Sequence, residues 1–122
     1  MSASRYTFPR SRRIGGRGTF KPIRDEGIRE SRGPLTLWAR PNELGHSRLG
    51  ISIGRHVGNA VKRNRIKRLL RESFRLLQHD FPHGYDLVIA VRPHETMIFA
   101  EYQKLLTAML VRVHGKWEQR KP

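Results

Sequence analysis

Basic side chains are concentrated between Arg55 and Arg75, a segment that holds eight of them against a single acid, Glu72. The apolar periodicity of residues 60–78 predicts a helix, with Asn59 as its N-cap. One side of that helix carries Ile66, Leu69, Leu70, Phe74 and Leu77, and the opposite side carries Asn64, Lys67, Arg68, Arg71 and Arg75. A solvated helix face normally mixes charges of both signs. All the charges on this face are positive, which favours a binding site for a polyanion.

The start of the same helix carries cations where the helix dipole is already positive. Lys62 and Arg63 fall in the predicted first turn, where each costs about 0.3–1 kcal/mol, and Arg55 and His56 lie just upstream. Phosphates bound there would remove this repulsion and accept hydrogen bonds from free backbone N–H groups. We therefore expect an RNA-backbone site around Arg55, Lys62, Arg63 and Arg65.

An aromatic residue on a predicted strand offers a different chemistry. Residues 34–41 alternate with period two between bounding prolines, so that Trp38 shares a face with Thr36 and Arg40 and not with its apolar neighbours. An indole on a polar face can stack an unpaired base, worth about 1–3 kcal/mol. The alternative is that Trp38 and Phe20 pack together beneath the first helix, since aromatic residues are common core builders.

The strand predicted over residues 48–55 extends this polar face. Leu49, Ile51 and Ile53 alternate with small residues, which are Gly50, Ser52 and Gly54. If this strand pairs in the expected register, the small residues lie on the same face as Trp38 and leave room for a nucleic-acid strand.

Catalysis by the chain itself is not indicated. A metal-dependent nuclease needs clustered carboxylates, but only ten acids are present, and the pair Asp25-Glu26 lies beside basic residues. His79 and His83 have i,i+4 spacing, yet Pro82 interrupts any helix between them. The absence of cysteine excludes thiolate nucleophiles and zinc–cysteine sites. Composition alone leaves a histidine-pair nuclease open, although no spacing supports one.

The overall charge points to nucleic acid as the partner. The 122 residues carry a formal net charge of +15, and residues 1–75 hold 19 basic and 5 acidic side chains against 6 and 5 in residues 76–122. Such an imbalance needs a polyanion to offset it. The longest aliphatic run, residues 87–91, is too short to span a bilayer, and no secretory signal is evident. We expect a cytoplasmic protein with no membrane partner.

The length predicts one domain of the α+β class, in which helices pack on a small sheet. A short helix to Gly27 comes first, with Thr19 as its expected cap and Pro22 in its first turn. The strands over 34–41 and 48–55 follow. The helix over 60–78, a buried strand over 85–92 and a final amphipathic helix marked by Ile98 to Val113 complete the order α-β-β-(β)-α-β-α. We divide the chain into a basic arm (1–12), the domain (13–116) and a tail (117–122).

The segment from Arg48 to Phe74 closely resembles the signature of the bacterial ribonuclease P protein family, with the core R-N-R-I-K-R at residues 63–68. Residues 84–93 resemble its last strand, and the likeness extends over about residues 12 to 113. The resemblance implies a left-handed β-α-β crossover, which runs against the usual hand. It also implies a protein subunit that assists the removal of the 5′ leader of precursor tRNA, while the ribonuclease P RNA carries the catalysis.

The resemblance further implies two RNA surfaces and no catalytic or metal-ligating residue in the protein. Mg²⁺ would be held mainly by the RNA, and no obligate protein partner is expected. Residues implied to bind the catalytic RNA are Arg55, Lys62, Arg63, Asn64, Arg65 and Arg68. Residues implied to bind the leader are Phe20, Trp38, Ser52, Lys67 and Arg71. Family members commonly carry a second aromatic residue four positions after the first; Arg24 stands there in this chain, which makes the leader site more electrostatic.

Two other classes of RNA- or DNA-binding protein fit the composition. A structural RNA-binding protein, such as a small ribosomal protein, matches the charge equally well, and only the ordered block over residues 48–74 argues against it. A DNA-packing protein fits less well, because the Trp38 face suits unpaired bases better than a duplex.

Overall fold

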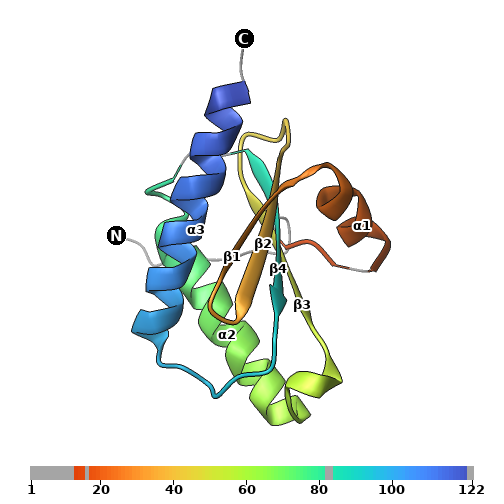
Figure 1. Cartoon of the computed structure of the whole chain (residues 1–122), viewed down its shortest axis with the longest axis vertical. Coiled ribbons are helices and arrows are strands. Elements are labelled where there is room, and N and C mark those ends of the chain that lie inside the picture. Colours follow the sequence, from red (N-terminus) through yellow and green to blue (C-terminus); the bar gives the residue numbers. More distant parts are fainter. Residues whose placement is uncertain (1–12, 16, 82–83, 121–122) are drawn as a thin grey trace.

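The computed structural model describes residues 13–15, 17–81 and 84–120. The elements in chain order are α1 (Arg17–Glu26), β1 (Ile28–Arg32), β2 (Leu35–Pro41), β3 (Arg48–Ile53), the short 3-10 helix η3 (Arg55–Val57), α2 (Ala60–Leu77), β4 (Tyr85–Val91) and α3 (Phe99–Arg120) (Figure 1). The predicted α+β class is confirmed. The predicted order left a third strand open after the two named ones; the additional strand is β1, which precedes both of them.

One mixed sheet forms the centre of the fold, with strand order β1-β2-β4-β3. β2 is antiparallel to both β1 and β4, whereas β3 is parallel to β4. The chain between these parallel neighbours contains α2, so β3, α2 and β4 form a β-α-β unit. The left hand of this crossover stays a prediction.

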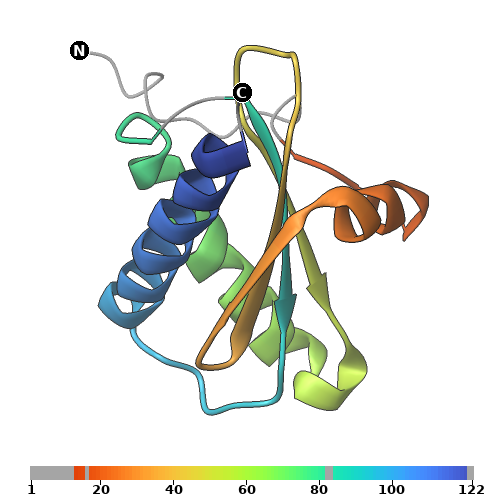
Figure 2. The ribbon, with the colours of Figure 1, turned by 45° about the horizontal axis from the view of Figure 1, so that its top comes forward.

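The two faces of the sheet are covered differently (Figure 2). Both α2 and α3 lie against one face, where the core is made of alternating strand residues such as Leu35, Leu37, Leu87 and Ile89, all at most 1% exposed. Among the described residues, α1 lies against the other face, over part of β2 and β4, and Ile14 just before it packs there with Ile23 and Val88. Period-two alternation produces this division, because successive strand side chains point to opposite faces.

The helix α2 begins and packs as its sequence predicts. The Asn59 side chain accepts a hydrogen bond from the Lys62 backbone N–H at 2.9 Å, which confirms the N-cap. Ile66, Leu70, Phe74 and Leu77 are buried against the sheet and α3, and Leu69 is partly buried at the edge of this core. The basic side of the helix consequently faces away from the core.

The helix α3 differs at both ends from its predicted extent. Ile98 lies before the helix and is 70% exposed, so it is not part of the apolar stripe. Beyond Val113 the helix continues to Arg120, and the Trp117 indole N–H donates to the Ala39 carbonyl at 2.8 Å. Residues 117–120 are therefore the end of α3, while residues 1–12 lie outside the described part and the predicted domain boundaries stay a prediction.

Two shorter predictions need correction. The helix α1 begins at Arg17 and not at Thr19, whose hydroxyl donates to the Gly15 carbonyl at 2.6 Å instead of capping the helix, so Pro22 lies beyond the first turn. β3 ends at Ile53, so Gly54 lies outside the strand and Arg55 belongs to η3.

A buried carboxylate joins β4 to three neighbouring segments. The Asp86 side chain is 2% exposed and accepts hydrogen bonds from Arg48 at 2.8 and 2.9 Å and from Asn42 at 2.8 Å. Arg40 lies 3.5 Å from the same carboxylate and also contacts Glu26 of α1 at 3.0 Å. Burial would raise the pKa of Asp86, but the hydrogen bonds and the charges of Arg48 and Arg40 outweigh it and hold that pKa below its usual value.

We expect the substitution Asp86→Asn to lower the free energy of unfolding at pH 7 by about 2 kcal/mol, because charged hydrogen bonds to a buried group are lost. The folded-state pKa is below the unfolded value of about 3.9, so this contribution is present above that value and is lost as pH falls through the folded pKa. Urea unfolding at pH 7 and at about pH 3 measures both effects. The exposed control Glu43→Gln should match the wild type; equal stability of Asp86→Asn and wild type at pH 7 would contradict the network.

Candidate nucleic-acid interface

A hollow of about 450 Å³ lies beside the basic side of α2. Its lining confirms the predicted grouping of helix residues and adds Arg13 from the chain before α1; the lining residues are Arg13, Asn64, Lys67, Arg68, Arg71, Glu72 and Arg75. Arg13 reaches this place because residues 13 and 14 run parallel to β3, with the Ile14 N–H donating to the Leu49 carbonyl at 2.9 Å. The hollow therefore collects five cations around one carboxylate.

The electrostatics of the hollow favour an added anion. Partial burial lowers the pKa of Arg71, and the nearby positive charge of Arg13 lowers it further. Arg71 still carries a full charge at neutral pH, since arginine titrates far above it. Glu72 forms an ion pair with Arg75, and this hydrogen bond lowers the pKa of Glu72 despite its partial burial. Within the hollow, the one carboxylate is thus already engaged, and a phosphate would relieve the repulsion between the cations.

The start of α2 forms a separate basic area. Arg55, Lys62, Arg63 and Arg65 do not line the hollow, whereas Asn64 and Arg68, predicted to act with them, do. The Asn59 cap already occupies the Lys62 backbone N–H, so this end has fewer free donors for a phosphate than its sequence suggested. Arg65 lies close enough to lower the pKa of Tyr102, although burial raises that pKa overall.

The register of the sheet places Trp38 as predicted. Trp38 pairs with Val88, which pairs with Gly50, so all three lie in one row across β2, β4 and β3. Ser52 lies in the next row of the same face, with Ala90 and Thr36. The predicted common face for Trp38 and these small residues is therefore confirmed.

The alternative prediction, that Phe20 and Trp38 pack together beneath the first helix, is also confirmed. Phe20 and Trp38 are partly buried and pack against a small cluster made of Ile14, Ile23 and Val88, beneath α1. A Cβ atom at Gly50 would lie 2.5 Å from the Phe20 ring. The room above Gly50 is therefore taken by Phe20 and is not left for nucleic acid, while part of each aromatic ring stays accessible.

Sequence reasoning missed one contact of this cluster. The Arg24 guanidinium lies 5.2 Å from the centre of the Trp38 ring and 6.0 Å from that of Phe20. The helical spacing of Phe20, Ile23 and Arg24 could have placed Arg24 on the side of α1 that faces the sheet, because residues three and four apart share a helix face.

The predicted leader-binding residues fall into two groups. Lys67 and Arg71 line the hollow beside α2, whereas Phe20 and Trp38 lie beneath α1 on the opposite face of the sheet. Residues 13 and 14 connect the groups, since Arg13 lines the hollow and Ile14 packs in the aromatic cluster. β3, which carries Ser52, runs between them.

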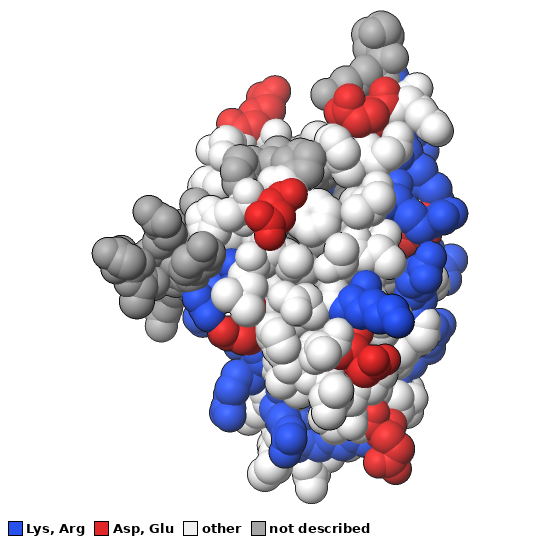
Figure 3. All heavy atoms as spheres, turned by 90° about the vertical axis from the view of Figure 1, so that its left-hand side faces the viewer, with Lys and Arg blue, Asp and Glu red and all other residues white. Residues whose placement is uncertain are grey.

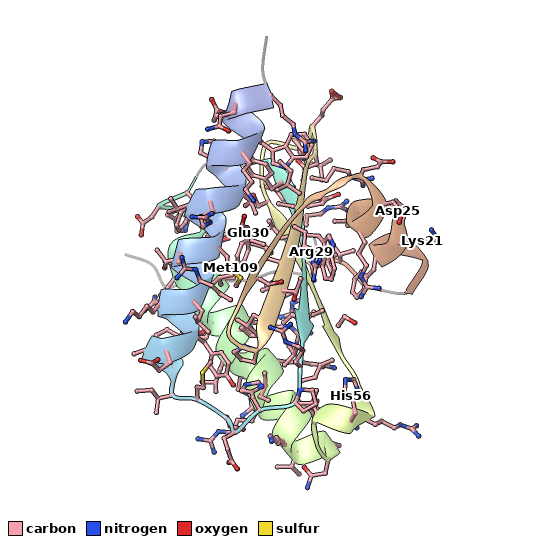
Figure 4. The ribbon with its side chains drawn as sticks, viewed as in Figure 1. Lys21, Asp25, Arg29, Glu30, His56 and Met109 are labelled. Carbon is pink, nitrogen blue, oxygen red and sulfur yellow. The ribbon has the colours of Figure 1, made fainter. Side chains whose placement is uncertain are left out.

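The described carboxylates do not form a metal centre. Among residues 13–15, 17–81 and 84–120, no group of three or more His, Asp or Glu side chains is placed to hold a metal ion. Asp25 pairs with Lys21 at 2.7 Å on the outer side of α1 (Figure 4). The sequence analysis considered His79 and His83 because of their i,i+4 spacing and rejected them as a pair. His83 lies outside the described residues.

Charges of both signs are mixed on the side of the molecule formed by α3 (Figure 3). Lys, Arg, Asp and Glu side chains surround a largely uncharged centre there, in contrast to the hollow beside α2. No helix of the described residues is long and apolar enough to cross a membrane.

A mixed four-stranded sheet with three helices and a predominantly basic hollow defines a small basic α+β protein suited to contact a polyanion. The sequence pattern of the family Ribonuclease P matches residues 8–114. The ribonuclease P protein component of Methylococcus capsulatus is 50% identical over 94 residues, which cover 76% of this chain and 73% of the relative. That of Photorhabdus laumondii is 45% identical over 89 residues, which cover 72% and 74%.

Solved structures agree with these relatives. The ribonuclease P protein of Thermotoga maritima superposes with a TM-score of 0.75 at 32% identity and covers 83% of this chain and 96% of its own. That of Staphylococcus aureus superposes with a TM-score of 0.73 at 30% identity and covers 84% and 94%. The chain belongs to the ribonuclease P protein family. It is a protein subunit of an endoribonuclease whose catalysis is carried by RNA and which matures the 5′ ends of tRNA.

We expect Gly50→Ala to displace Phe20 and to lower the free energy of unfolding by about 1–3 kcal/mol, because the added methyl group overpacks the aromatic cluster. Urea unfolding gives the stability, and the fluorescence of Trp38 reports the cluster. Gly115→Ala is the matched control, since a Cβ there meets nothing within 4 Å, and it should be neutral or slightly stabilising. Equal behaviour of both variants would contradict the described packing of Phe20.

Proposed function

We propose that this subunit binds the ribonuclease P RNA and the 5′ leader of precursor tRNA at the same time, through two different surfaces. The observation that carries the proposal is the hollow beside α2, in which five cations surround one carboxylate that is already paired. Such a site gains most from a ligand that brings several phosphates in a row, as an RNA backbone does.

The surface proposed for the catalytic RNA combines the start of α2 with the outer part of its basic side. Its residues are Arg55, Lys62, Arg63, Asn64, Arg65 and Arg68. Arg55 in η3 shortly precedes α2, whose first turn carries Lys62 and Arg63. Asn64, Arg65 and Arg68 follow in the next two turns of the helix. A helix of this kind suits contact with backbone phosphates, which position an RNA without reading its sequence.

The surface proposed for the leader combines stacking with charge. Its residues are Phe20, Trp38, Ser52, Lys67 and Arg71. The aromatic pair offers partly exposed rings to unpaired bases, and Lys67 and Arg71 offer charge on the other side of β3. An unpaired leader that passes Trp38, crosses β3 near Ser52 and ends against α2 would contact both groups.

The chemistry is proposed to stay with the RNA. In keeping with the ribonuclease P family, the catalytic Mg²⁺ ions are assigned to the RNA subunit and no step is assigned to the protein. The cations of the protein screen the repulsion between two RNA molecules, which lowers the Mg²⁺ concentration that their association needs. With these partners, the protein works in the cytoplasm.

The direct test is cleavage of the 5′ leader from a precursor tRNA by a bacterial ribonuclease P RNA at low Mg²⁺. We expect cleavage only when RNA and protein are both present, and none with the protein alone. If the protein binds RNA tightly and yet adds nothing to cleavage, the assisting role is wrong and a structural RNA-binding role is favoured.

Single substitutions separate the two surfaces. Arg65→Ala should weaken binding to the ribonuclease P RNA and lower the slope of log affinity against log salt by about one, since one phosphate contact is lost. Lys67→Ala should do the same for precursor tRNA that carries a leader. Lys104, an exposed residue of α3 that does not line the hollow, provides the control Lys104→Ala with the same change of charge. Unchanged slopes for both test variants would contradict the proposed surfaces.

A further inference from the structure

The position of Arg24 over the aromatic pair raises a question about access to Trp38. Its guanidinium lies 5.2 Å from the Trp38 ring centre and 6.0 Å from that of Phe20. A base that stacks on this side of the indole must share the ring with the guanidinium or replace it. The contact between a cation and a ring is weak where the cation is exposed, as Arg24 is.

The charge of Arg24 is not offset by an acid of its own helix. Asp25 pairs with Lys21 at 2.7 Å, and Glu26 pairs with Arg40 at 3.0 Å. Among the described residues, no carboxylate lies within ion-pair distance of Arg24. Its guanidinium therefore keeps N–H donors available for a phosphate while it rests on the rings.

The packing of α1 fixes where Arg24 emerges. Ile23 is 1% exposed in the cluster with Ile14 and Val88, and it holds the helix against the sheet. At Gly27 the helix end approaches β2 so closely that a Cβ would lie 3.0 Å from the Ala39 carbonyl oxygen. With both ends of this turn fixed, Arg24 leaves the helix where its guanidinium can lie over the Trp38 ring.

We propose that Arg24 is a further leader-binding residue: its guanidinium covers Trp38 in the free protein and moves to a leader phosphate when an unpaired nucleotide stacks on the indole. The exchange is favourable because base stacking on an aromatic ring is stronger than an exposed cation–π contact, and the displaced guanidinium gains a charged hydrogen bond. This inference rests on the proposed function of Trp38 in leader binding and adds a residue that binds the same nucleotide by charge.

The test uses the full chain assembled with a bacterial ribonuclease P RNA. Binding of precursor tRNA with an unpaired leader is compared with binding of mature tRNA over a range of salt concentrations. Arg24→Ala and Arg24→Gln should weaken leader-bearing substrate by about three- to tenfold and lower its salt slope by about 0.7, the value for one phosphate of a single strand. Binding of mature tRNA should not change. Arg24→Lys should keep the slope, because it keeps the charge.

Fluorescence reports the proposed movement. The signal of Trp38 is the difference between the wild type and Trp38→Phe, which share Trp117. In Arg24→Ala the emission of the free protein should shift because the indole loses its cover, and an unpaired RNA oligonucleotide should still quench it. Lys104→Ala is the matched control and should behave as the wild type in every measurement, because it lies on α3 across the sheet.

The outcomes separate this proposal from the one on which it rests. If Trp38→Ala removes the preference for leader-bearing substrate but the neutral Arg24 variants retain wild-type affinity and slope, only the role of Arg24 is wrong. The same conclusion follows if those variants bind leader-bearing substrate more tightly, since Arg24 would then only obstruct the ring. If Trp38→Ala leaves the preference unchanged, leader binding at this face is wrong, and the role of Arg24 with it.

Discussion

The packing of the apolar side of α2 against the sheet is the constraint on which the rest of the structure depends. Ile66, Leu70 and Phe74 are at most 3% exposed, and their burial determines the rotation of the helix about its axis. With that rotation fixed, the basic residues of α2 must face outward along β3. The hollow and its concentration of charge thus follow from a hydrophobic contact, while the cations themselves add repulsion and no stability.

The second face of the sheet meets a different constraint. Within the described residues it is covered by the short helix α1 and by Ile14 just before it. The helix is held by Ile23 and by the chain of ion pairs from Glu26 through Arg40 to Asp86. A face covered to this extent leaves Phe20 and Trp38 partly accessible. The same packing that keeps the aromatic rings in place therefore allows them to meet an unpaired base, so a structural role and a binding role are compatible at these residues.

Sequence patterns predicted the parts of the fold that have strong periodicity. The helix α2, its cap at Asn59 and the alternation in β2 are local properties of the chain, and all were predicted. The sequence did not predict β1, because Ile28 is the only apolar residue in Ile28–Arg32. As an edge strand, β1 needs no second apolar residue. The pairing of Arg13 with β3 is non-local and lies next to a segment whose charge resembles a solvated arm.

The sequence predicted which residues form the candidate site better than it predicted how they are arranged in space. Helical periodicity placed Lys67, Arg71 and Arg68 together, but it could not show that β3 separates them from Phe20 and Trp38. Helical spacing could place Arg24 on the side of α1 that faces the sheet, but its position over Trp38 also depends on how α1 crosses the sheet, which local spacing does not give. Stacking and charge at the leader site are therefore coupled by tertiary packing.

The absence of cysteine from the chain makes one measurement especially direct. A single cysteine introduced by Arg68→Cys or by Lys104→Cys can carry an iron–EDTA probe that cleaves nearby RNA through hydroxyl radicals. In the complex with ribonuclease P RNA, the probe at position 68 is predicted to cut the RNA at a few defined places, and the probe at position 104 is predicted to cut it weakly or not at all. Strong cutting from position 104 with none from position 68 would contradict the account, because the RNA would then lie against α3 and not against the basic side of α2.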